Sequence, residues 1–262
     1  MKSVIIYTYY NSPSSNYNLA FFLEREVVYR DNIDYIFVVN GFETDKSIIF
    51  PNLDNVTVIR RENIGFDFGG HASALEDIQT KGKVYDYYFF MNSGVIGPIL
   101  PHYVKTPHWS HFFIEKINDT VKLVGTTIVC LPDWDDGGYG PKVEGFFFMV
   151  DQIGLYTLKK QGTIFKNHET KYSAVIHGEY GLSNCILNNG YSIDCMLRKY
   201  QGIDWRKRNN YNLNNNESPS RSMTFYNNSI NPYEVIFHKW FWQGKKDTVN
   251  YNIIEQHVNN NT

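Results

Sequence analysis

Short apolar runs alternate with segments of helical period along most of the chain, and this alternation limits the folds it can adopt. Six runs rich in β-branched and aromatic residues predict strands at 3–10, 34–41, 56–61, 85–92, 122–130 and 144–150. Helical patterns begin at Asn18, His71, Asp151 and Tyr180. The last two are followed by Gly162 and Gly190, which are typical helix ends. Strands that alternate with helices favour right-handed crossovers. We therefore expect an α/β fold with a mostly parallel central sheet flanked by helices.

The polar segment at 209–222 is the main interruption of this pattern. Its sequence, NNYNLNNNESPSRS, has too little apolar surface to order itself, so we expect a mobile loop. Only about 40 residues follow it, which is near the lower limit for an independent domain. We expect the aromatic run at 231–242 to be strand-like, and the whole of 223–262 to dock on the core. Residues 1–262 are thus predicted to form one domain.

Composition excludes some classes of partner. The formal net charge of −2 gives no global field that would favour nucleic acid. The first apolar run is too short to span a membrane and lacks a signal-peptide cleavage pattern. The three cysteines have no metal-ligand spacing, and their odd number argues against a disulfide framework. We expect a cytoplasmic protein with no transmembrane segment.

Polar residues gather where the predicted strands end, and ligands bind at the carboxyl ends of strands in open α/β sheets. They are Thr8, Tyr10 and Asn11 after the first strand; Arg61, Asn63, Gly65 and Asp67 after the third; Asn92 and Ser93 after the fourth; and Asp133, Asp135 and Asp136 after the fifth.

The turn after the third strand matches neither GxGxxG nor a P-loop. Two readings of it stay open. Gly69 and Gly70 would open a helix at His71 and present backbone N–H groups to an anion, or the segment is a tight turn with Asp67 as helix cap.

Several motifs together resemble those of nucleotide-sugar glycosyltransferases of the GT-A fold, in particular bacterial, algal and viral enzymes related to rhamnan-synthesis proteins. The motifs are RRENIGFDFGGHASAL (60–75), YYFFMNSGVIGPILP (87–101), KLVGTTIVC (122–130), EGFFFMVDQIGLYTL (144–158), GEYGLSNCILNNGYSID (178–194) and NPYEVIFHKW (231–240). The resemblance implies a GT-A-like Rossmann-type domain. It also implies transfer of a sugar from a UDP- or GDP-linked donor to a hydroxyl of a glycan or glycoconjugate, with inversion.

The resemblance also implies residue roles. Residues 8–11 and Arg61 would lie near the nucleoside. Asn63, Gly65, Asp67, Asn92 and Ser93 would lie near the donor sugar and diphosphate, which His238 and Lys239 would also approach. Gly145 would lie beside the acceptor, and Glu179, opening a helix beneath it, would be the general base. Asp133, Asp135 and Asp136 are candidate acceptor contacts or substitute metal ligands.

One departure concerns the metal. Enzymes of this fold usually carry Asp-x-Asp after the fourth strand, where this chain has Asn92, Ser93 and Gly94. Divalent Mn²⁺ or Mg²⁺ prefers carboxylates. Either another acid supplies the ligand, or His238, Lys239 and Arg side chains stabilise the diphosphate. Two other functions stay open: an inactive sugar-nucleotide- or glycan-binding module, and a Rossmann-like oxidoreductase, which the missing glycine fingerprint disfavours.

Overall fold

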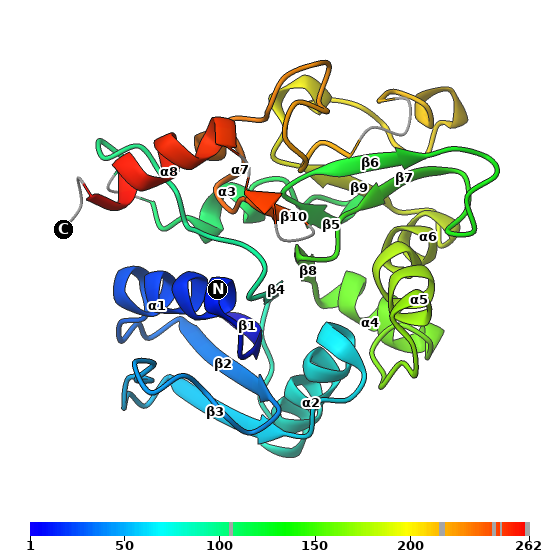
Figure 1. Cartoon of the computed structure of the whole chain (residues 1–262). Helices are drawn as coiled ribbons and strands as arrows, with labels where there is room; N and C mark the ends of the chain where they lie inside the picture. The colour runs from blue at the N-terminus through cyan, green and yellow to red at the C-terminus, as the bar shows by residue number, and fades with distance from the viewer. Residues whose placement is uncertain (105–106, 215–217, 243–244, 247, 260–262) are drawn as a thin grey trace.

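A seven-stranded sheet in the order β3–β2–β1–β4–β8–β5–β9 runs through the computed structural model of the chain (Figure 1). Its strands are β1 (Ser3–Tyr10), β2 (Ile33–Asn40), β3 (Val56–Arg61), β4 (Tyr87–Asn92), β5 (Val121–Gly125), β8 (Phe147–Asp151) and β9 (Ser192–Cys195). Only β8 runs antiparallel to its neighbours within this sheet. The structure describes all residues except 105–106, 215–217, 243–244, 247 and 260–262. The predicted α/β fold with a mostly parallel sheet is confirmed.

Helices cover both faces of this sheet. They are α1 (Pro13–Glu26), α2 (Phe66–Thr80), α3 (Ser110–Ile114), α4 (Gln152–Gln161), α5 (Lys171–Ser173), α6 (Tyr180–Asn188), α7 (Pro232–Val235) and α8 (Thr248–Asn259), with 3₁₀ turns at Arg198–Tyr200 and Arg208–Asn210. Successive side chains of β1 enter two different cores, because a strand points alternate residues to opposite faces. Val4 and Ile6 pack with α2, α4 and α6, whereas Ile5 packs with α1 and α3.

The predicted fifth strand is divided, and the predicted sixth strand is shortened at its start. Residues 122–130 form β5 and then β6 (Ile128–Leu131), which leaves the sheet to pair with β7 (Gly140–Val143). The break follows Gly125, where a Cβ would lie 2.4 Å from Val143 Cγ1, so the hairpin folds directly onto the end of β5. Residues 144–146 were predicted as strand but form the approach to β8. Gly145 and Phe146 of this segment line a small cavity.

The C-terminal aromatic run, predicted to be strand-like, is so only in part. It begins with α7, turns at Ile236 with φ +66°, and pairs through His238 with Ile96 before β10 (Phe241–Trp242) and β11 (Lys245–Lys246). Phe237 stacks on Phe147 with 4.5 Å between ring centres, which fixes this segment to the core.

Part of the polar segment at 209–222 is also attached to the core. Asn214 is 2% exposed; its Oδ1 accepts from Cys130 N and its Nδ2 donates to Ile128 O. This side chain thus pairs with the backbone of β6, while residues 215–217 lie outside the described part.

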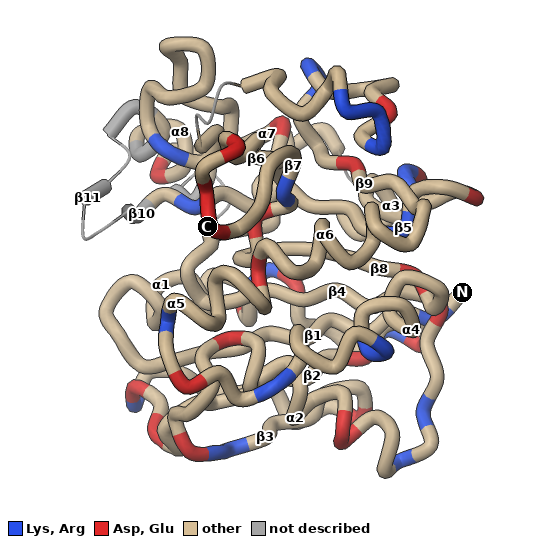
Figure 2. Tube along the Cα trace, turned by 90° about the vertical axis from the view of Figure 1, so that its right-hand side faces the viewer, with Lys and Arg blue, Asp and Glu red and all other residues tan. Residues whose placement is uncertain are grey.

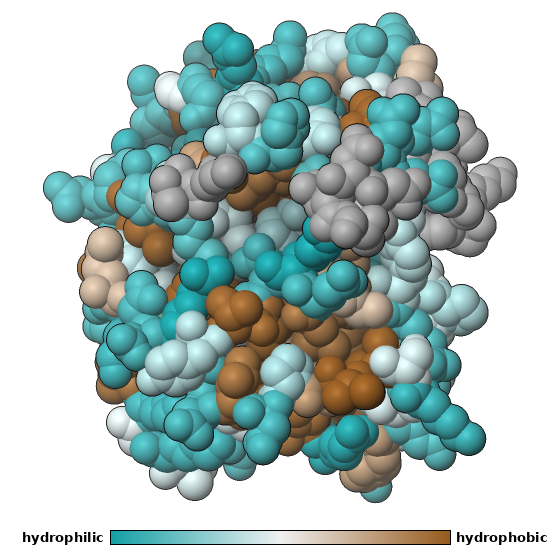
Figure 3. Space-filling view, turned by 90° about the vertical axis from the view of Figure 1, so that its left-hand side faces the viewer, coloured by the Kyte–Doolittle hydropathy of each residue, from teal (hydrophilic) through white to brown (hydrophobic). Residues whose placement is uncertain are grey.

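Positively and negatively charged residues are both found along the chain in the upper and the lower half of the molecule (Figure 2). An apolar area lies on the lower half of the face at the left of Figure 1, bordered by hydrophilic residues (Figure 3). No helix within 1–104, 107–214, 218–242, 245–246 and 248–259 has the length and apolar character needed to cross a bilayer.

Candidate functional site

Two adjoining cavities lie at the carboxyl ends of β1, β2 and β4. The wide cavity, about 660 Å³, is lined by Tyr10, Asn40, Asn63, Ile64, Gly65, Phe66, Asp67, Asn167, His168 and Glu169. The narrow cavity, about 150 Å³, is lined by Phe66, Asp67, Phe68, Asn92, Gly145, Phe146, Lys171, Ala174, Val175, Glu179 and Lys239. Phe66 and Asp67 line both, so the two cavities adjoin at these residues.

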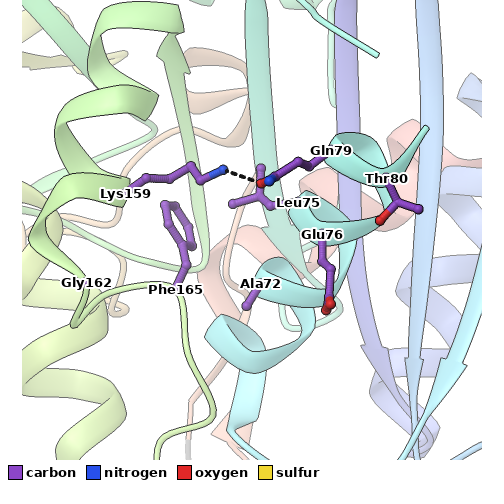
Figure 4. A pocket seen from close by; sticks show the side chains of 8 residues that line it. All are labelled: Ala72, Leu75, Glu76, Gln79, Thr80, Lys159, Gly162 and Phe165. Atoms are coloured by element: carbon purple, nitrogen blue, oxygen red, sulfur yellow. Dashed lines mark hydrogen bonds between the residues drawn. The ribbon is translucent and has the colours of Figure 1, made fainter. Parts of the chain in front are cut away.

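A third cavity of about 510 Å³ lies apart from these two, between α2 and α4. Figure 4 shows its walls, where Lys159 reaches toward Gln79 and Phe165 lies beside it. Lys159 Nζ donates to Gln79 Oε1 at 3.3 Å. This cavity shares no lining residue with the wide or the narrow cavity.

Arg61 holds the turn that walls the wide cavity. Its Nη1 donates to Asn40 Oδ1 and to Ile64 O, both at 2.9 Å, and its Nη2 donates to Asn167 Oδ1 at 2.6 Å. Gly65 has φ +74°, and a Cβ there would lie 2.4 Å from the Cα of Asn167. Only glycine can adopt this positive φ and also leave room for the backbone of Asn167. The predicted donor residue Arg61 therefore joins β2, the turn and the 167–169 segment.

The glycine pair does not open a helix at His71, because α2 already begins at Phe66. Gly70 instead allows close packing, since a Cβ there would lie 2.6 Å from Thr8 Cγ2. Thr8 is 1% exposed, and its hydroxyl is 3.0 Å from His71 Nδ1. Thr8 thus lies behind α2 and does not line either cavity. Asp67 makes no capping bond and projects from the first turn of α2 into the cavities.

Asp67 is bonded to the end of β4. Its Oδ2 accepts from Asn92 Nδ2 at 2.7 Å, and Asn92 Oδ1 accepts from Gly94 N at 2.9 Å. Burial raises the pKa of Asp67, while the bond from Asn92 and the charges of Lys239 and Lys171 oppose that rise.

The donor set at the end of β4 fits a hard divalent cation poorly. Asn92 and Ser93 stand where carboxylates would be needed, and both of Asn92's amide atoms already have protein partners. Within the described part of the chain, no three His, Cys, Asp or Glu side chains gather into a possible metal site.

Glu179 lies in the middle of a continuous helical stretch. A π-helical turn, Ala174–Glu179, joins α5 to α6. Glu179 directly precedes α6, but the predicted helix start is not a free helix N-terminus, because the π turn continues into α6. Its side chain packs against the approach to β8: a Cβ on Gly145 would lie 2.8 Å from Glu179 Cγ.

The surroundings of Glu179 raise its pKa. Burial raises it to about 6; Lys239 opposes this, while Glu144 and Asp67 add to it through their negative charge. Glu144 is itself buried, accepting bonds from the hydroxyls of Thr127, Ser218 and Ser220. Glu179 therefore has a proton affinity suited to a base that works near neutral pH.

Lys239 and His238 differ in position. Lys239 lines the narrow cavity, with its Nζ 5.3 Å from the centre of the Phe146 ring. His238 is 1% exposed, exchanges backbone bonds with Ile96, and lies with Nε2 3.4 Å from Asn250 Nδ2. His238 does not line either cavity.

Some of the remaining predicted residues line a cavity, and the others lie outside both cavities. Tyr10, Asn63 and Gly65 line the wide cavity, and Gly145 lines the narrow one. Asn11 is exposed and Ser93 is buried, and neither is a lining residue. Asp133, Asp135 and Asp136 lie in the loop between β6 and β7, where Asp135 accepts from Gly137 N and Asp136 from the Tyr172 hydroxyl.

Sequence reasoning missed several lining residues. Asn40 ends β2 at the same edge as the predicted residues, so the strand-end rule was sufficient to find it. Lys171 and the segment Asn167–Glu169 have no such signal, because only the tertiary fold brings them to the turn at Gly65.

Comparisons with known proteins complete the description. No family model and no curated protein sequence matches the chain. Among solved structures, it is similar to the mannosyltransferase PcManGT from Pyrobaculum calidifontis in complex with GDP-Man and Mn²⁺, with 15% identity, a TM-score of 0.45, and coverage of 74% of this chain and 54% of that one. It is also similar to the catalytic domain of Drosophila β1,4-galactosyltransferase 7 in complex with xylobiose, with 10% identity, a TM-score of 0.39, and coverage of 78% and 66%. The chain thus spans 54% and 66% of those chains' lengths, and both are glycosyltransferases.

Proposed function

We propose that this protein transfers a glycosyl group from a nucleotide-diphosphate sugar to a hydroxyl of an acceptor glycan or glycoconjugate, with inversion at the anomeric carbon. One observation carries the proposal. A carboxylate with a pKa of about 6, Glu179, shares a small cavity with Asp67 and Lys239, and that cavity adjoins a larger one.

In this proposal the donor lies with its nucleoside in the wide cavity and its sugar in the narrow cavity. The nucleoside occupies the wide cavity, where the exposed ring of Tyr10 offers a stacking surface and Asn63 offers amide groups. The diphosphate reaches Lys239 and Lys171, and the sugar lies against Asp67. Lysine is a common phosphate-binding residue, so these two ammonium groups stabilise the leaving diphosphate without a metal.

The reaction uses Glu179 as general base. At pH 7 a carboxyl group with a pKa of about 6 is mostly ionised. Glu179 takes the acceptor hydroxyl's proton while the acceptor oxygen bonds to the anomeric carbon. The bond from that carbon to the diphosphate oxygen breaks on the opposite side, which inverts the configuration and releases the nucleoside diphosphate.

We further propose a cytoplasmic location. Cys130, Cys185 and Cys195 are buried free thiols, and a reducing compartment keeps thiols in that state.

A thermal-shift screen of UDP- and GDP-linked hexoses and deoxyhexoses, with and without Mn²⁺, tests the donor. A specific donor should raise the melting temperature by mass action, and EDTA should leave most of that rise in place. Loss of the whole rise in EDTA, with recovery in Mn²⁺, would contradict the metal-independent part of the proposal.

Asp67→Ala tests the sugar position. It should weaken binding of the nucleotide sugar more than binding of the free nucleoside diphosphate, whereas Asp133→Ala, outside both cavities, should change neither. Equal loss for both ligands would assign Asp67 a structural role. If the protein binds a donor but never releases nucleotide from it, with or without acceptors, it is a binding module and not an enzyme.

A further inference from the structure

The loop between β6 and β7 carries an exposed tryptophan. Trp134 is 75% exposed, whereas Trp109, Trp205 and Trp240 are at most 3% exposed. Among the tryptophans whose side chains the structure describes, Trp134 alone is on the surface. When a ligand covers a large apolar ring that is exposed to water, the free energy of the system falls.

This exposure does not come from a loosely held loop. Asp135 Oδ1 accepts from Gly137 N at 2.7 Å, and Asn184 Nδ2 donates to Gly137 O at 2.9 Å. A Cβ on Gly137 would lie 2.2 Å from Tyr180 Cδ2, so the loop backbone rests directly on α6. Figure 1 shows this loop beside α5 and α6. The helical stretch that carries Glu179 therefore also supports the loop.

A second exposed aromatic residue connects the loop to the narrow cavity. Tyr172 is 60% exposed, and its hydroxyl donates to Asp136 Oδ2 at 2.7 Å, which fixes the orientation of the ring. Its neighbour Lys171 lines the narrow cavity. Tyr172 thus links the loop that carries Trp134 to a residue next to the narrow cavity.

We propose that Trp134, Tyr172 and Asp133 form an acceptor subsite that binds a sugar ring of an oligosaccharide, beyond the sugar whose hydroxyl reacts. The proposal rests on the proposed glycosyl transfer. Aromatic rings offer flat apolar faces to the C–H faces of sugars, and the exposed carboxylate of Asp133 accepts bonds from their hydroxyls. Trp134 does not line the narrow cavity, so the acceptor class that this subsite would take is a glycan of at least two or three sugars, with one at the cavity and another on Trp134.

Binding of trisaccharides tests this subsite without turnover. The full-length Glu179→Gln protein is titrated with cellotriose, mannotriose and chitotriose, and with the matching monosaccharides, by tryptophan fluorescence and calorimetry. At least one trisaccharide should bind about tenfold or more tightly than its monosaccharide and should change the emission of Trp134. Trp134→Ala should remove about tenfold of that affinity, and Trp134→Phe should restore part of it. Tyr156→Ala is the control, because Tyr156 is 68% exposed but lies on α4.

Two results would overturn the subsite: no trisaccharide binds better than its monosaccharide, or Trp134→Ala binds the best trisaccharide as tightly as the parent protein. The donor assays separate this proposal from the proposed function. Trp134→Ala should leave nucleotide-sugar binding unchanged. A protein that binds a trisaccharide through Trp134 but binds no nucleotide sugar would keep the subsite and refute the glycosyl transfer.

Discussion

The wide and the narrow cavity share Phe66 and Asp67 but differ in the chemistry of their other walls. The wide cavity offers the exposed ring of Tyr10 and amides such as Asn63. The narrow cavity adds the charged residues Glu179, Lys171 and Lys239 in less than a quarter of the volume, 150 against 660 Å³. Charges that are close together and partly shielded from water act strongly on one another. If the protein acts as we propose, donor recognition and catalysis use different residues of adjoining cavities, and substitutions can separate the two.

The largest effect is expected from Glu179→Gln. The amide keeps the shape but cannot accept a proton, so the transfer rate should fall by roughly 10²–10⁴-fold, the range of general base catalysis. Donor affinity should stay nearly unchanged, because the wide cavity is intact. Rates measured with saturating donor test this, and product analysis should show inverted configuration. Near-normal transfer by the variant, or a retained configuration, would refute the assignment of Glu179.

Lys239→Ala should act on the diphosphate. A hydrogen bond to a charged group contributes about 1.5–3 kcal/mol, so affinity for the nucleoside diphosphate should fall by roughly 10–100-fold. Calorimetry with the nucleoside diphosphate and with the uncharged nucleoside measures this. The nucleoside should bind both proteins equally, and an equal loss for both ligands would show that Lys239 does not meet the phosphates.

Tyr10→Ala should lack the selectivity that is expected of Asp67→Ala. Stacking of a base on an aromatic side chain is worth about 1–3 kcal/mol, so we expect about a tenfold loss of affinity. The loss should be equal for the free nucleotide and the nucleotide sugar, because Tyr10 lines the wide cavity only. Tyr10→Phe, which keeps the ring, is the matched control. A larger loss for the nucleotide sugar would place Tyr10 at the sugar.

The smallest effect concerns stability. Folding raises the pKa of Glu179 from 4.5 to about 6, so the folded state binds this proton more tightly than the unfolded state. The free energy of unfolding therefore falls as the pH rises from 4.5 to 6, and the loss is complete above that range. Glu179→Gln should remove this loss and raise the unfolding free energy by about 1 kcal/mol at pH 8, since partial exposure to water reduces the effect. Urea unfolding should show no gain at pH 4. Equal gains at both pH values would mean that the charge is not the cause.

The first half of the fold was largely predictable from the sequence. The predicted bounds of β1 and β3 agree with the structure, because β1 is rich in β-branched and aromatic residues, and β3 begins with four β-branched residues, Val56–Ile59. The strand-end rule also placed Tyr10, Asn63 and Asp67 at one edge of the sheet. Local signals were sufficient there because Tyr10 ends β1, and Asn63 and Asp67 lie within six residues of the end of β3.

The second half was less predictable, because long-range packing decides it. The run at 122–130 reads as one strand, but Val143 packs against Gly125 and directs β6 into a separate hairpin. Asn167 lies 106 positions from Arg61, and no local pattern indicates that the two side chains meet. Aromatic residues at 231–242 suggested a strand. Contacts with the core, such as the stacking of Phe237 on Phe147, determine the structure of this segment instead.

The π-helical turn before α6 makes the length of this helix as important as its composition. Such a turn contains an additional residue compared with an α-helix, and such turns occur frequently at functional sites. A deletion of one residue between Ala174 and His177 would bring Glu179 to the position of Gly178, rotated by about 100°. Even a Cβ at Gly178 would lie only 2.7 Å from Phe68 Cδ2, so a carboxylate has no room there. The helix thus tolerates changes of side chain on its outer face more readily than the loss of a single position.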